Sequence, residues 1–408
     1  MKLYEDLEWR GLIKDISSED LRKKLNEESL TFYIGTDPTG DSMHIGHFSS
    51  FLIAARLKNA GHNPLLLIGG ATGLIGDPKP TSERTIISKE EVDKNVVALS
   101  KQAKEIFGFE IVNNYDWCKE FNFIDYLRDY GKFFTVNYMI DKDIIKRRLA
   151  TGITYTEFSY MIMQALDFET LYREKDCVLQ VAGSDQWGNI TAGIDLVRKK
   201  LGKEAYGFTM PLILDKNGNK FGKTEGNAVW LDKDKTSSYE MYQFLFNSDD
   251  TLVIDYLKKL TFLTKEEIES IEEEHNKAPE KRIAQIALCE NVITYLHSKE
   301  DYLNAKKISE SLFSEKIYEL SSEDIINSVT GVNNIKVNES SINLVDFLVN
   351  YNVCSSKREA REMVSGNAIT INGKKVNDLE FSLEKEDAID KKVYLLKKGK
   401  KNYYLITY

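Results

Sequence analysis

The stretch YIGTDPTGDSMHIGH, residues 33–47, combines the end of a strand, a tight turn and the start of a helix. Leu30 to Gly35 is apolar and rich in β-forming residues, which predicts a strand. Residues 36–42 contain an Asp-Pro pair, a glycine and an Asp-Ser pair, which predict a turn whose last two residues could cap a helix. From Met43 the apolar spacing is helical and continues to about Ala60. Free backbone N–H groups and the positive end of the helix dipole would meet here, so the stretch predicts a phosphate site.

His44 and His47 are three residues apart on the first turn of this predicted helix, so their side chains share one face. Such a pair can also be two metal ligands or two surface histidines. No cysteine or third histidine follows at a ligand spacing, so we expect no protein-bound metal. The position of the pair after a strand and a turn favours nucleotide binding instead.

The composition is that of an ordinary globular protein, with 42% hydrophobic and 29% charged residues in a chain of 408, enough for two or three domains. The apolar runs are far too short to span a bilayer, so we expect no membrane partner. The N-terminal MKLYEDLEWRG has acids where a signal peptide needs a basic and then an apolar stretch, which argues against export. The cysteines are scattered without a CxxC pair, which predicts reduced thiols and a cytoplasmic protein: Cys118, Cys177, Cys289 and Cys354.

Strand and helix patterns alternate between residues 30 and 215, which predicts an α/β fold built on a parallel sheet of Rossmann type. Pro64 to Gly69 and Val178 to Ala182 are continuous apolar runs, typical of strands covered on both faces. Residues 215–227 are polar and glycine-rich, which predicts a mobile surface loop. A site is expected where the parallel strands end at their carboxyl termini.

The same patterns divide the chain into four parts. We expect the Rossmann-type domain at 1–220, a glycine- and lysine-containing loop and an all-α domain at 221–320, a linker at 321–340, and a small α+β domain at 341–408. The last part has 12 Lys and Arg against 9 Asp and Glu, whereas the whole chain carries a net charge of −9. This asymmetry gives weak support to a C-terminal domain that touches phosphate backbones.

Several segments carry a resemblance to a known family. HIGH at 44–47, after its strand and Asp-Pro turn, resembles the first signature of the class I aminoacyl-tRNA synthetases. Three segments follow in order, TEFSYMIMQALDF at 156–168, QVAGSDQWGNITAG at 180–193 and KFGKT at 220–224, and SSKREAREMVSGNAITINGK at 355–374 resembles the S4 RNA-binding module. Together, from about Tyr33 to the C-terminus, they resemble the bacterial-type tyrosyl-tRNA synthetases.

This resemblance implies a Rossmann-type catalytic domain, a helical domain for the anticodon arm, and a C-terminal S4-like domain. It implies a ligase that activates L-tyrosine with ATP, accompanied by Mg²⁺, and then transfers tyrosine to the 3′ end of tRNA(Tyr). It also implies a homodimer. The apolar run Phe133 to Ile140 would suit a dimer interface, although it would equally suit a core.

The resemblance assigns residues to the tyrosine pocket: Tyr33 and Asp167 at the phenolic hydroxyl, Asp77, Tyr160 and Gln164 at the ammonium group, and Gln186 near the reacting carboxylate. A buried carboxylate and phenol need a partner hydroxyl, and phenylalanine would leave both unpaired. We therefore expect Asp167→Ala to erode the preference for tyrosine over phenylalanine. The simpler interpretations are an ordinary strand aromatic for Tyr33 and a helix-surface acid for Asp167.

Activation needs no general base, because the substrate carboxylate is already ionised at pH 7. The enzyme instead positions the reactants and stabilises the charge that builds on pyrophosphate. The resemblance gives this work to residues around ATP: Thr39, His44, His47, Lys220, Lys223 and Thr224, with Asp185 on the ribose hydroxyls. Asp37 would hold the α-phosphate region through its backbone, and Gly35 would let the nucleotide come close. Ser50 would touch the ribose or pack in the core. The segment DPKPTSERT from Asp77 is shorter than the family pattern, so Lys79 and Arg84 are only provisional phosphate residues.

The C-terminal domain would present its basic residues to tRNA phosphates: Lys357, Arg358 and Arg361 on one predicted helix, Lys374 and Lys375 after a turn, and Lys391, Lys392, Lys397, Lys398, Lys400 and Lys401 at the end. Such contacts give salt-dependent affinity with little reading of bases. Solubility alone is the simpler interpretation of these lysines, as a solvated loop is for Lys220 and Lys223. Deleting 341–408 is expected to abolish tRNA charging and spare adenylate formation.

Three other classes of protein share part of this pattern. A tryptophanyl-type enzyme has the same fold and phosphate motifs, but it would lack the phenol-binding pair and the S4-like tail. A nucleotidyltransferase that makes a small-molecule adenylate would need no RNA module. A non-catalytic RNA-binding relative would have lost the lysine loop or the histidines, and both are present here.

Overall fold

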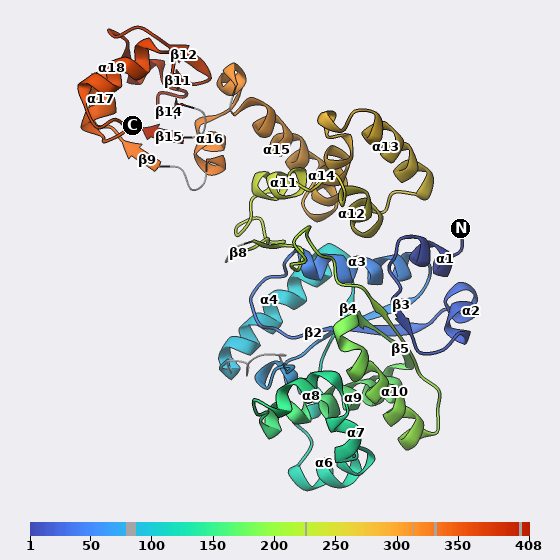
Figure 1. Cartoon of the computed structure of the whole chain (residues 1–408). Helices are drawn as coiled ribbons and strands as arrows, with labels where there is room; N and C mark the ends of the chain where they lie inside the picture. The colour runs from blue at the N-terminus through green and yellow to red at the C-terminus, as the bar shows by residue number, and fades with distance from the viewer. Residues whose placement is uncertain (79–86, 225–226, 313, 330–332, 400–401) are drawn as a thin grey trace. The chain divides into compact units, whose positions relative to one another are not determined.

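The computed structural model describes residues 1–78, 87–224, 227–312, 314–329, 333–399 and 402–408 (Figure 1). Two compact units divide the chain: Met1–Thr236 with Ser248–Val292, and Ser237–Asn247 with Ile293–Tyr408. In the described part of the chain, no helix combines the length and the apolar character needed to cross a membrane.

The first unit is built on a sheet with the strand order β1-β6-β5-β2-β3-β4. Its strands are β1 (Asp15–Ile16), β2 (Thr31–Thr36), β3 (Asn63–Ile68), β4 (Glu110–Asn113), β5 (Cys177–Gly183) and β6 (Tyr206–Met210). β2 to β6 pair in parallel, and only the short β1 runs antiparallel, against β6. The predicted α/β fold with a parallel sheet of Rossmann type is confirmed.

Helices cover both faces of this sheet, with α3 and α4 on one face and α9 and α10 on the other (Figure 1). The helical elements of the unit are α1 (Leu3–Trp9), α2 (Asp20–Glu27), α3 (Ile45–Asn59), η1 (Thr72–Leu74), α4 (Lys89–Phe107), α5 (Tyr115–Cys118), α6 (Phe123–Asp129), η2 (Gly131–Phe133), α7 (Val136–Ile140), α8 (Asp143–Leu149), α9 (Tyr155–Lys175), η3 (Ser184–Gln186), α10 (Trp187–Leu201), α12 (Val253–Leu260), α13 (Lys265–Lys277) and η4 (Pro279–Lys281). A short hairpin joins β7 (Lys223–Thr224) to β8 (Asn227–Ala228).

Successive side chains of a strand point to opposite faces of the sheet, so the strands contribute to two apolar cores, one on each face. Tyr33, Leu65 and Leu67 pack with Phe168 of α9. On the other face, the rings of α3 meet those that end α4, with Phe51 edge-on to Phe107 at 5.7 Å between ring centroids. Both faces are therefore apolar, which explains why the strands are apolar without interruption.

The order of the strands reverses beside β2, because the chain continues outward through β3 and β4 and later returns through β5 and β6 on the other side. In sheets of this kind the crevice at the carboxyl ends of the two strands flanking the reversal binds ligands. β2 and β5 pair directly, with Tyr33 beside Gln180. The residues that follow these two strands are therefore the ones placed to form a site.

The second unit contains α11 (Ser238–Phe246), α15 (Lys299–Ser311), η5 (Glu315–Glu319) and α16 (Ser322–Ser328), and α14 (Ile283–Leu296) crosses from the first unit into it. Its C-terminal part has a sheet in the order β12-β11-β14-β15-β9 and a β10-β13 pair. These elements are β9 (Asn333–Lys336), β10 (Ser341–Asn343), α17 (Leu344–Asn350), α18 (Lys357–Ser365), β11 (Ile369–Ile371), β12 (Lys374–Val376), β13 (Ser382–Glu384), η6 (Lys385–Asp387), β14 (Val393–Lys398) and β15 (Asn402–Thr407).

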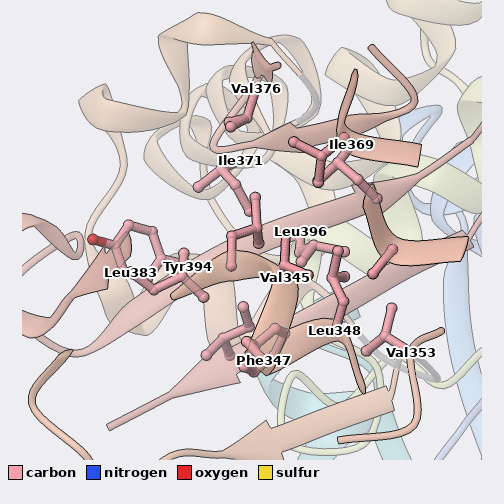
Figure 2. Packing of buried hydrophobic residues seen from close by; sticks show 14 of the residues in the cluster. Val345, Phe347, Leu348, Val353, Ile369, Ile371, Val376, Leu383, Tyr394 and Leu396 are labelled. Atoms are coloured by element: carbon pink, nitrogen blue, oxygen red, sulfur yellow. The ribbon is translucent and has the colours of Figure 1, made fainter. Parts of the chain in front are cut away.

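This C-terminal part has a core of its own (Figure 2). Phe347 and Leu348 of α17 pack against the sheet residues Ile369 and Leu396, and all four are completely or almost completely buried. Every member of this apolar cluster lies at or after Ile335. Among the described residues, this core therefore draws on the C-terminal part alone.

The structure differs from the sequence prediction in the range 321–340. This range was predicted as a linker, yet it contains α16 and β9. β9 pairs in parallel with β15, with Ile335 beside Ile406. Its side chains are mostly exposed, which is why the segment lacks apolar periodicity.

Candidate active site

A pocket of about 360 Å³ lies at the carboxyl ends of β2 and β5. Fourteen of its lining residues were predicted as site residues from the sequence, and the structure brings them together: Tyr33, Gly35, Asp37, Thr39, His44, His47, Ser50, Asp77, Tyr160, Gln164, Asp167, Asp185, Gln186 and Lys220. They come from β2 and the turn after it, from α3 and α9, from the loop after η1, from the turn after β5, and from the segment after β6. Residues far apart in the chain therefore converge on one cavity.

The two histidines form a reciprocal cap at the start of α3. His44 is the N-cap residue, and its Nδ1 accepts from the Gly46 N–H at 3.1 Å, while His47 Nδ1 accepts from the His44 N–H at 3.1 Å. The rings stack with centroids 4.0 Å apart. Because each Nδ1 is an acceptor, the neutral tautomer carries its proton on Nε2, which makes both rings N–H donors.

This cap corrects two predictions. The helix is capped by His44 and not by Asp41 or Ser42. The first amides of α3 are also engaged, since Ile45 N–H donates to the Val229 carbonyl at 2.8 Å and Gly46 N–H donates to His44. Free backbone N–H groups were expected to bind a phosphate here, but the segment that follows β8 and the imidazole already occupy them. The first amides of α3 are therefore engaged within the chain and not available to an anion.

The floor of the pocket is formed by Tyr33 of β2 and Asp167 of α9. Asp167 is almost completely buried, and its Oδ1 accepts from Trp117 Nε1 at 2.8 Å while its Oδ2 accepts from Asn114 Nδ2 at 3.0 Å. The Tyr33 hydroxyl is buried and has no hydrogen-bond partner among the described residues. A buried, unpaired hydroxyl beside a carboxylate suits a ligand that brings its own hydroxyl.

Burial sets the protonation of this floor. It raises the pKa of Asp167 to about 7, although the hydrogen bonds from Asn114 and Trp117 act in the opposite direction. Burial, and then the charge of Asp167, raise the pKa of Tyr33 well above its ordinary value. The phenol therefore stays protonated over the physiological range, whereas the carboxyl group changes its charge near neutral pH.

A chain of hydrogen bonds leads from the floor to the next carboxylate. Asn114 Nδ2 also donates to Thr72 Oγ1 at 3.0 Å, and Thr72 Oγ1 donates to Asp37 Oδ1 at 2.8 Å. Tyr160 closes the chain, with its hydroxyl 3.1 Å from Asp37 Oδ2. The Ala71 N–H donates to Asn114 Oδ1 at 2.7 Å, which fixes the amide so that its NH₂ group faces Asp167.

A second acidic position lies between α10 and the loop after η1. Asp77 accepts from Gln186 Nε2 at 2.7 Å, and Asn189 Nδ2 reaches both Asp77 at 3.4 Å and Gln186 Oε1 at 2.9 Å. Asp37 and Asp77 both act on Tyr160, whose pKa is raised well above its ordinary value, first by burial and then by these charges. Two carboxylates near one phenol make this side of the pocket favourable for an ammonium group.

The pocket lining that the structure describes also includes a lysine, Lys220. Lys220 Nζ lies 3.7 Å from Asp185 Oδ2, and both side chains are about half exposed. Gly35, Thr39 and Ser50 also line the pocket, and the Ser50 hydroxyl donates to the Gly46 carbonyl at 3.5 Å. Lys223 and Thr224 form β7, but their side chains lie outside the structural description, as do Lys79 and Arg84 altogether.

Comparison with known proteins identifies the family of this site. Residues 25–314 match the family model of class I tRNA synthetases (W and Y), and residues 324–406 match that of the SYY-like C-terminal domain of tyrosine–tRNA ligase. The chain is 48% identical to the tyrosine–tRNA ligase of Staphylococcus carnosus, over 100% of this chain and 99% of that protein. The chain belongs to the tyrosine–tRNA ligase family of class I synthetases. The tyrosine–tRNA ligase of Listeria monocytogenes is 47% identical over 100% of both chains.

A solved structure of this family has the same fold. The C-terminally truncated mitochondrial tyrosyl-tRNA synthetase of Aspergillus nidulans superimposes with a TM-score of 0.67 at 32% sequence identity. The match covers 76% of this chain and 94% of that chain. As a class I synthetase the chain uses ATP. Within the described residues, no group of three or more His, Cys, Asp or Glu side chains is placed to hold a metal ion.

Sequence reasoning missed two residues that line this synthetase pocket, Thr72 and Gln180, and three that bond its carboxylates, Asn114, Trp117 and Asn189. Asn114 and Trp117 follow β4, a strand that ends at the same edge of the sheet as the site. Their position after a strand was the available signal. Gln180 is a polar residue within an apolar strand, it is 2% exposed, and its Oε1 has no partner among the described residues. That interruption of VLQVA was a signal too.

The residues predicted to bind tRNA lie in the second unit. Lys357, Arg358 and Arg361 are exposed on α18, and Lys374 is exposed on β12. Lys357 pairs with Asp346 at 2.6 Å and Arg358 with Glu362 at 3.0 Å, so the two cations already have acidic neighbours. Lys398 differs from its prediction as a phosphate contact, because it is 16% exposed and bonds Glu359 at 2.8 Å and the Val353 carbonyl. Lys400 and Lys401 lie outside the described residues.

Proposed function

We propose that this pocket converts L-tyrosine and ATP to tyrosyl-adenylate and pyrophosphate, and then transfers tyrosine to the 3′ end of tRNA(Tyr). Membership of the tyrosine–tRNA ligase family supports this reaction. The observation that carries the choice of substrate is the floor, where the unpaired Tyr33 hydroxyl lies beside the buried Asp167. A phenolic hydroxyl placed there gives Tyr33 its missing partner and donates to the carboxylate.

The rest of the amino acid is held by the polar side chains above this floor. Asp77, Tyr160 and Gln164 bind the ammonium group, because the carboxylate and the two dipoles favour a cation. Gln186 lies near the reacting carboxylate, and its bond to Asp77 fixes its orientation. Tyr160 and Gln164 are one helical turn apart on α9, and both line the pocket, which supports a shared task.

The nucleotide is held at the end of the pocket that carries the histidines and Lys220. Gly35 lets the nucleotide approach closely, Asp37 holds the region of the α-phosphate through its backbone, and Asp185 accepts from the ribose hydroxyls. The Nε2–H groups of His44 and His47 donate to phosphate oxygens, with the hydroxyl of Thr39. Lys220, Lys223 and Thr224 act on pyrophosphate.

These groups perform catalysis by stabilising charge. The tyrosine carboxylate attacks the α-phosphorus, the bond to the bridging oxygen breaks, and negative charge builds on the departing pyrophosphate. Imidazole and lysine donors stabilise that charge more in the transition state than in the ground state, and no proton has to be removed from the nucleophile. Mg²⁺ bound to the phosphates would supply further positive charge there.

The parts of the chain share the work. We assign activation to a catalytic domain at 1–220, anticodon-arm binding to the helical region at 221–320, and phosphate contacts to the S4-like domain at 341–408. The exposed Lys357, Arg358, Arg361 and Lys374 support the last assignment. A cytoplasmic location fits the cysteines, all of which are described and none of which forms a disulfide.

Tyrosine-dependent ATP–pyrophosphate exchange tests the proposed reaction. Exchange is measured with each of the twenty amino acids at equal concentration. We expect rapid exchange with tyrosine alone, because only its hydroxyl satisfies both groups of the floor. Fast exchange with tryptophan and slow exchange with tyrosine would contradict the assignment of Tyr33 and Asp167.

We also propose a homodimer that uses the apolar surface of α6 to α9. Phe123 is 69% exposed, Val136 60% and Tyr155 64%, and these helices gather at one end of the first unit (Figure 1). Within the predicted interface run 133–140, Val136 is exposed while Met139 is buried. Exposed apolar side chains on neighbouring helices are typical of an interface between subunits.

Phe123→Asp is expected to weaken this dimer by about tenfold or more, because a charge replaces an apolar side chain that the partner would bury. Sedimentation velocity at micromolar concentration measures the mass. The matched control is Val97→Asp on α4, which removes an equally exposed apolar side chain (70%) elsewhere in the unit. A wild-type chain that sediments as a monomer, or equal loss in both variants, would rule out this surface as the interface.

A further inference from the structure

Lys220 is carried by a β-hairpin after β6. Leu214 and Lys220 face each other across its two arms, with Phe221 N–H donating to the Ile213 carbonyl at 2.9 Å and Asp215 N–H donating to the Asn219 carbonyl at 2.8 Å. The turn needs Gly218, whose φ is +81°. The predicted loop at 215–227 therefore begins as regular structure, with a defined position for Lys220.

Leu214 and Lys220 are a non-hydrogen-bonded pair of this hairpin. Their backbone N–H and C=O groups therefore point outward, away from the opposite arm. The outward carbonyl of Leu214 accepts a hydrogen bond from the Tyr256 hydroxyl at 2.8 Å. The Tyr256 ring also packs on the Phe221 ring, with centroids 4.5 Å apart. Tyr256 thus touches the residue opposite Lys220 and the residue after it.

Tyr256 is a firm anchor for this contact. Its side chain is 3% exposed, and burial raises its pKa to about 12, so the hydroxyl remains a donor at physiological pH. It lies in the middle of α12, a helix of the same unit. Because one buried side chain makes both a hydrogen bond and a ring contact, it fixes the distance of the hairpin from α12 and the orientation of the hairpin relative to that helix.

The end of α12 is bound in turn to the helix that carries the histidines. Arg56 of α3 donates from Nη2 to the Lys258 carbonyl at 3.4 Å and also to the Thr261 carbonyl. Arg10, the residue after α1, donates to the same Lys258 carbonyl at 2.9 Å. The two guanidinium groups therefore occupy the carbonyls that a helix leaves unpaired at its C-terminus. α12 links α3, which begins at His44 and His47, to the hairpin that carries Lys220.

We propose that Tyr256 is a positioning residue that holds Lys220 in place for the charge that builds on pyrophosphate. The inference deepens the proposed function and rests on the role given there to Lys220. It assigns to α12 the task of setting the distance between the two groups of phosphate donors, the histidines and the lysine. A residue of this kind affects the rate of adenylate formation and leaves the binding of tyrosine unchanged, because the tyrosine floor lies on other elements.

Tyr256→Phe removes the hydrogen bond and keeps the ring. We expect the rate constant of tyrosyl-adenylate formation to fall about fivefold, the effect of one ordinary hydrogen bond. The tyrosine Kd measured without ATP should stay within about twofold of the wild-type value. The matched control is Tyr130→Phe, because Tyr130 is an equally buried tyrosine of the same unit. This variant removes the 3.2 Å hydrogen bond from the Tyr130 hydroxyl to Glu169 and should leave the rate of adenylate formation unchanged.

A double-mutant cycle separates positioning from general support of the fold. Lys220→Ala alone is expected to slow adenylate formation by about ten- to a hundredfold. Adding Tyr256→Phe to Lys220→Ala should then change the rate by less than about twofold, because the residue to be positioned is gone. Phe221→Leu, which removes the ring contact, is a second variant with the same expected pattern.

The outcomes are distinguishable. If Lys220→Ala is as fast as wild type, the proposed role of Lys220 is wrong. If Lys220→Ala is slow but Tyr256→Phe and Phe221→Leu match wild type, only the inference is wrong. If Tyr256→Phe slows the reaction by the same factor with and without Lys220, Tyr256 supports the fold and does not position the lysine.

Discussion

A chain truncated after Leu320 is expected to keep tyrosine-dependent ATP–pyrophosphate exchange within about twofold, while aminoacylation of tRNA(Tyr) falls by on the order of a hundredfold or more. Every described residue that lines the pocket lies at or before Phe221, and we therefore expect activation not to need the C-terminal part. Affinity for tRNA depends on phosphate contacts, and the exposed cations of α18 and β12 are removed.

The position of the cut follows from the structure. Deletion of 341–408, as the sequence suggested, would leave β9 without its partner β15 and Ser322 without the Asp390 carboxylate that accepts from its N–H at 2.6 Å. Ending the chain at Leu320 removes α16 and β9 together with the core that they border. The truncated relative from Aspergillus nidulans that shares this fold supports the feasibility of such a chain.

A variant of the full-length chain tests whether the loss of tRNA charging comes from the loss of basic side chains or from the loss of the whole C-terminal part. Arg361→Glu should weaken charging and reduce its sensitivity to salt, because a phosphate contact becomes a repulsion. Lys101→Glu, at a 75% exposed position on α4, is the matched control and should charge tRNA normally. If the truncated chain also loses pyrophosphate exchange, the proposed division between activation and tRNA binding is wrong.

The sequence predicts well those parts of the fold that depend on patterns among neighbouring residues. β2, β3 and β5 begin and end within one or two residues of the apolar runs that predicted them. The turn at 36–47 combines Asp-Pro, glycine and two histidines within a few residues, so local chemistry identifies it. Local patterns also place Tyr160, Gln164 and Asp167 on one helix, and the structure confirms that all three line the pocket.

The parts that sequence did not predict depend on contacts across the chain. Asn114 and Trp117 bond Asp167 from 53 and 50 residues away, and neither lies in a recognised motif. β9 is a strand only because β15, some seventy residues later, pairs with it. The Ile45 N–H at the start of α3 is engaged because Val229 returns to accept from it. None of these partners is visible in a window of neighbouring residues.

Asp167→Ala is expected to slow tyrosine activation about ten- to a hundredfold and to leave phenylalanine activation nearly unchanged, so the preference for tyrosine falls by the same factor. The physical reason is the hydrogen bond from the substrate hydroxyl to a buried charged group, which only tyrosine can make. The measurement is kcat/KM in pyrophosphate exchange for both amino acids. Asp167→Asn is the matched variant, since it keeps the volume of the side chain and removes its charge.

The same carboxyl group makes tyrosine binding depend on pH. Burial raises its pKa to about 7 in the free protein, and a donated hydrogen bond from the substrate favours its ionised form. Binding therefore releases a proton below that pKa, so the tyrosine Kd should fall as the pH rises from 5.5 to 7, by up to about tenfold per pH unit, and then level off. Asp167→Asn should remove this dependence, and phenylalanine should not show it. A wild-type Kd that is constant over this range, or an equal slope for phenylalanine, would place the phenolic hydroxyl away from Asp167.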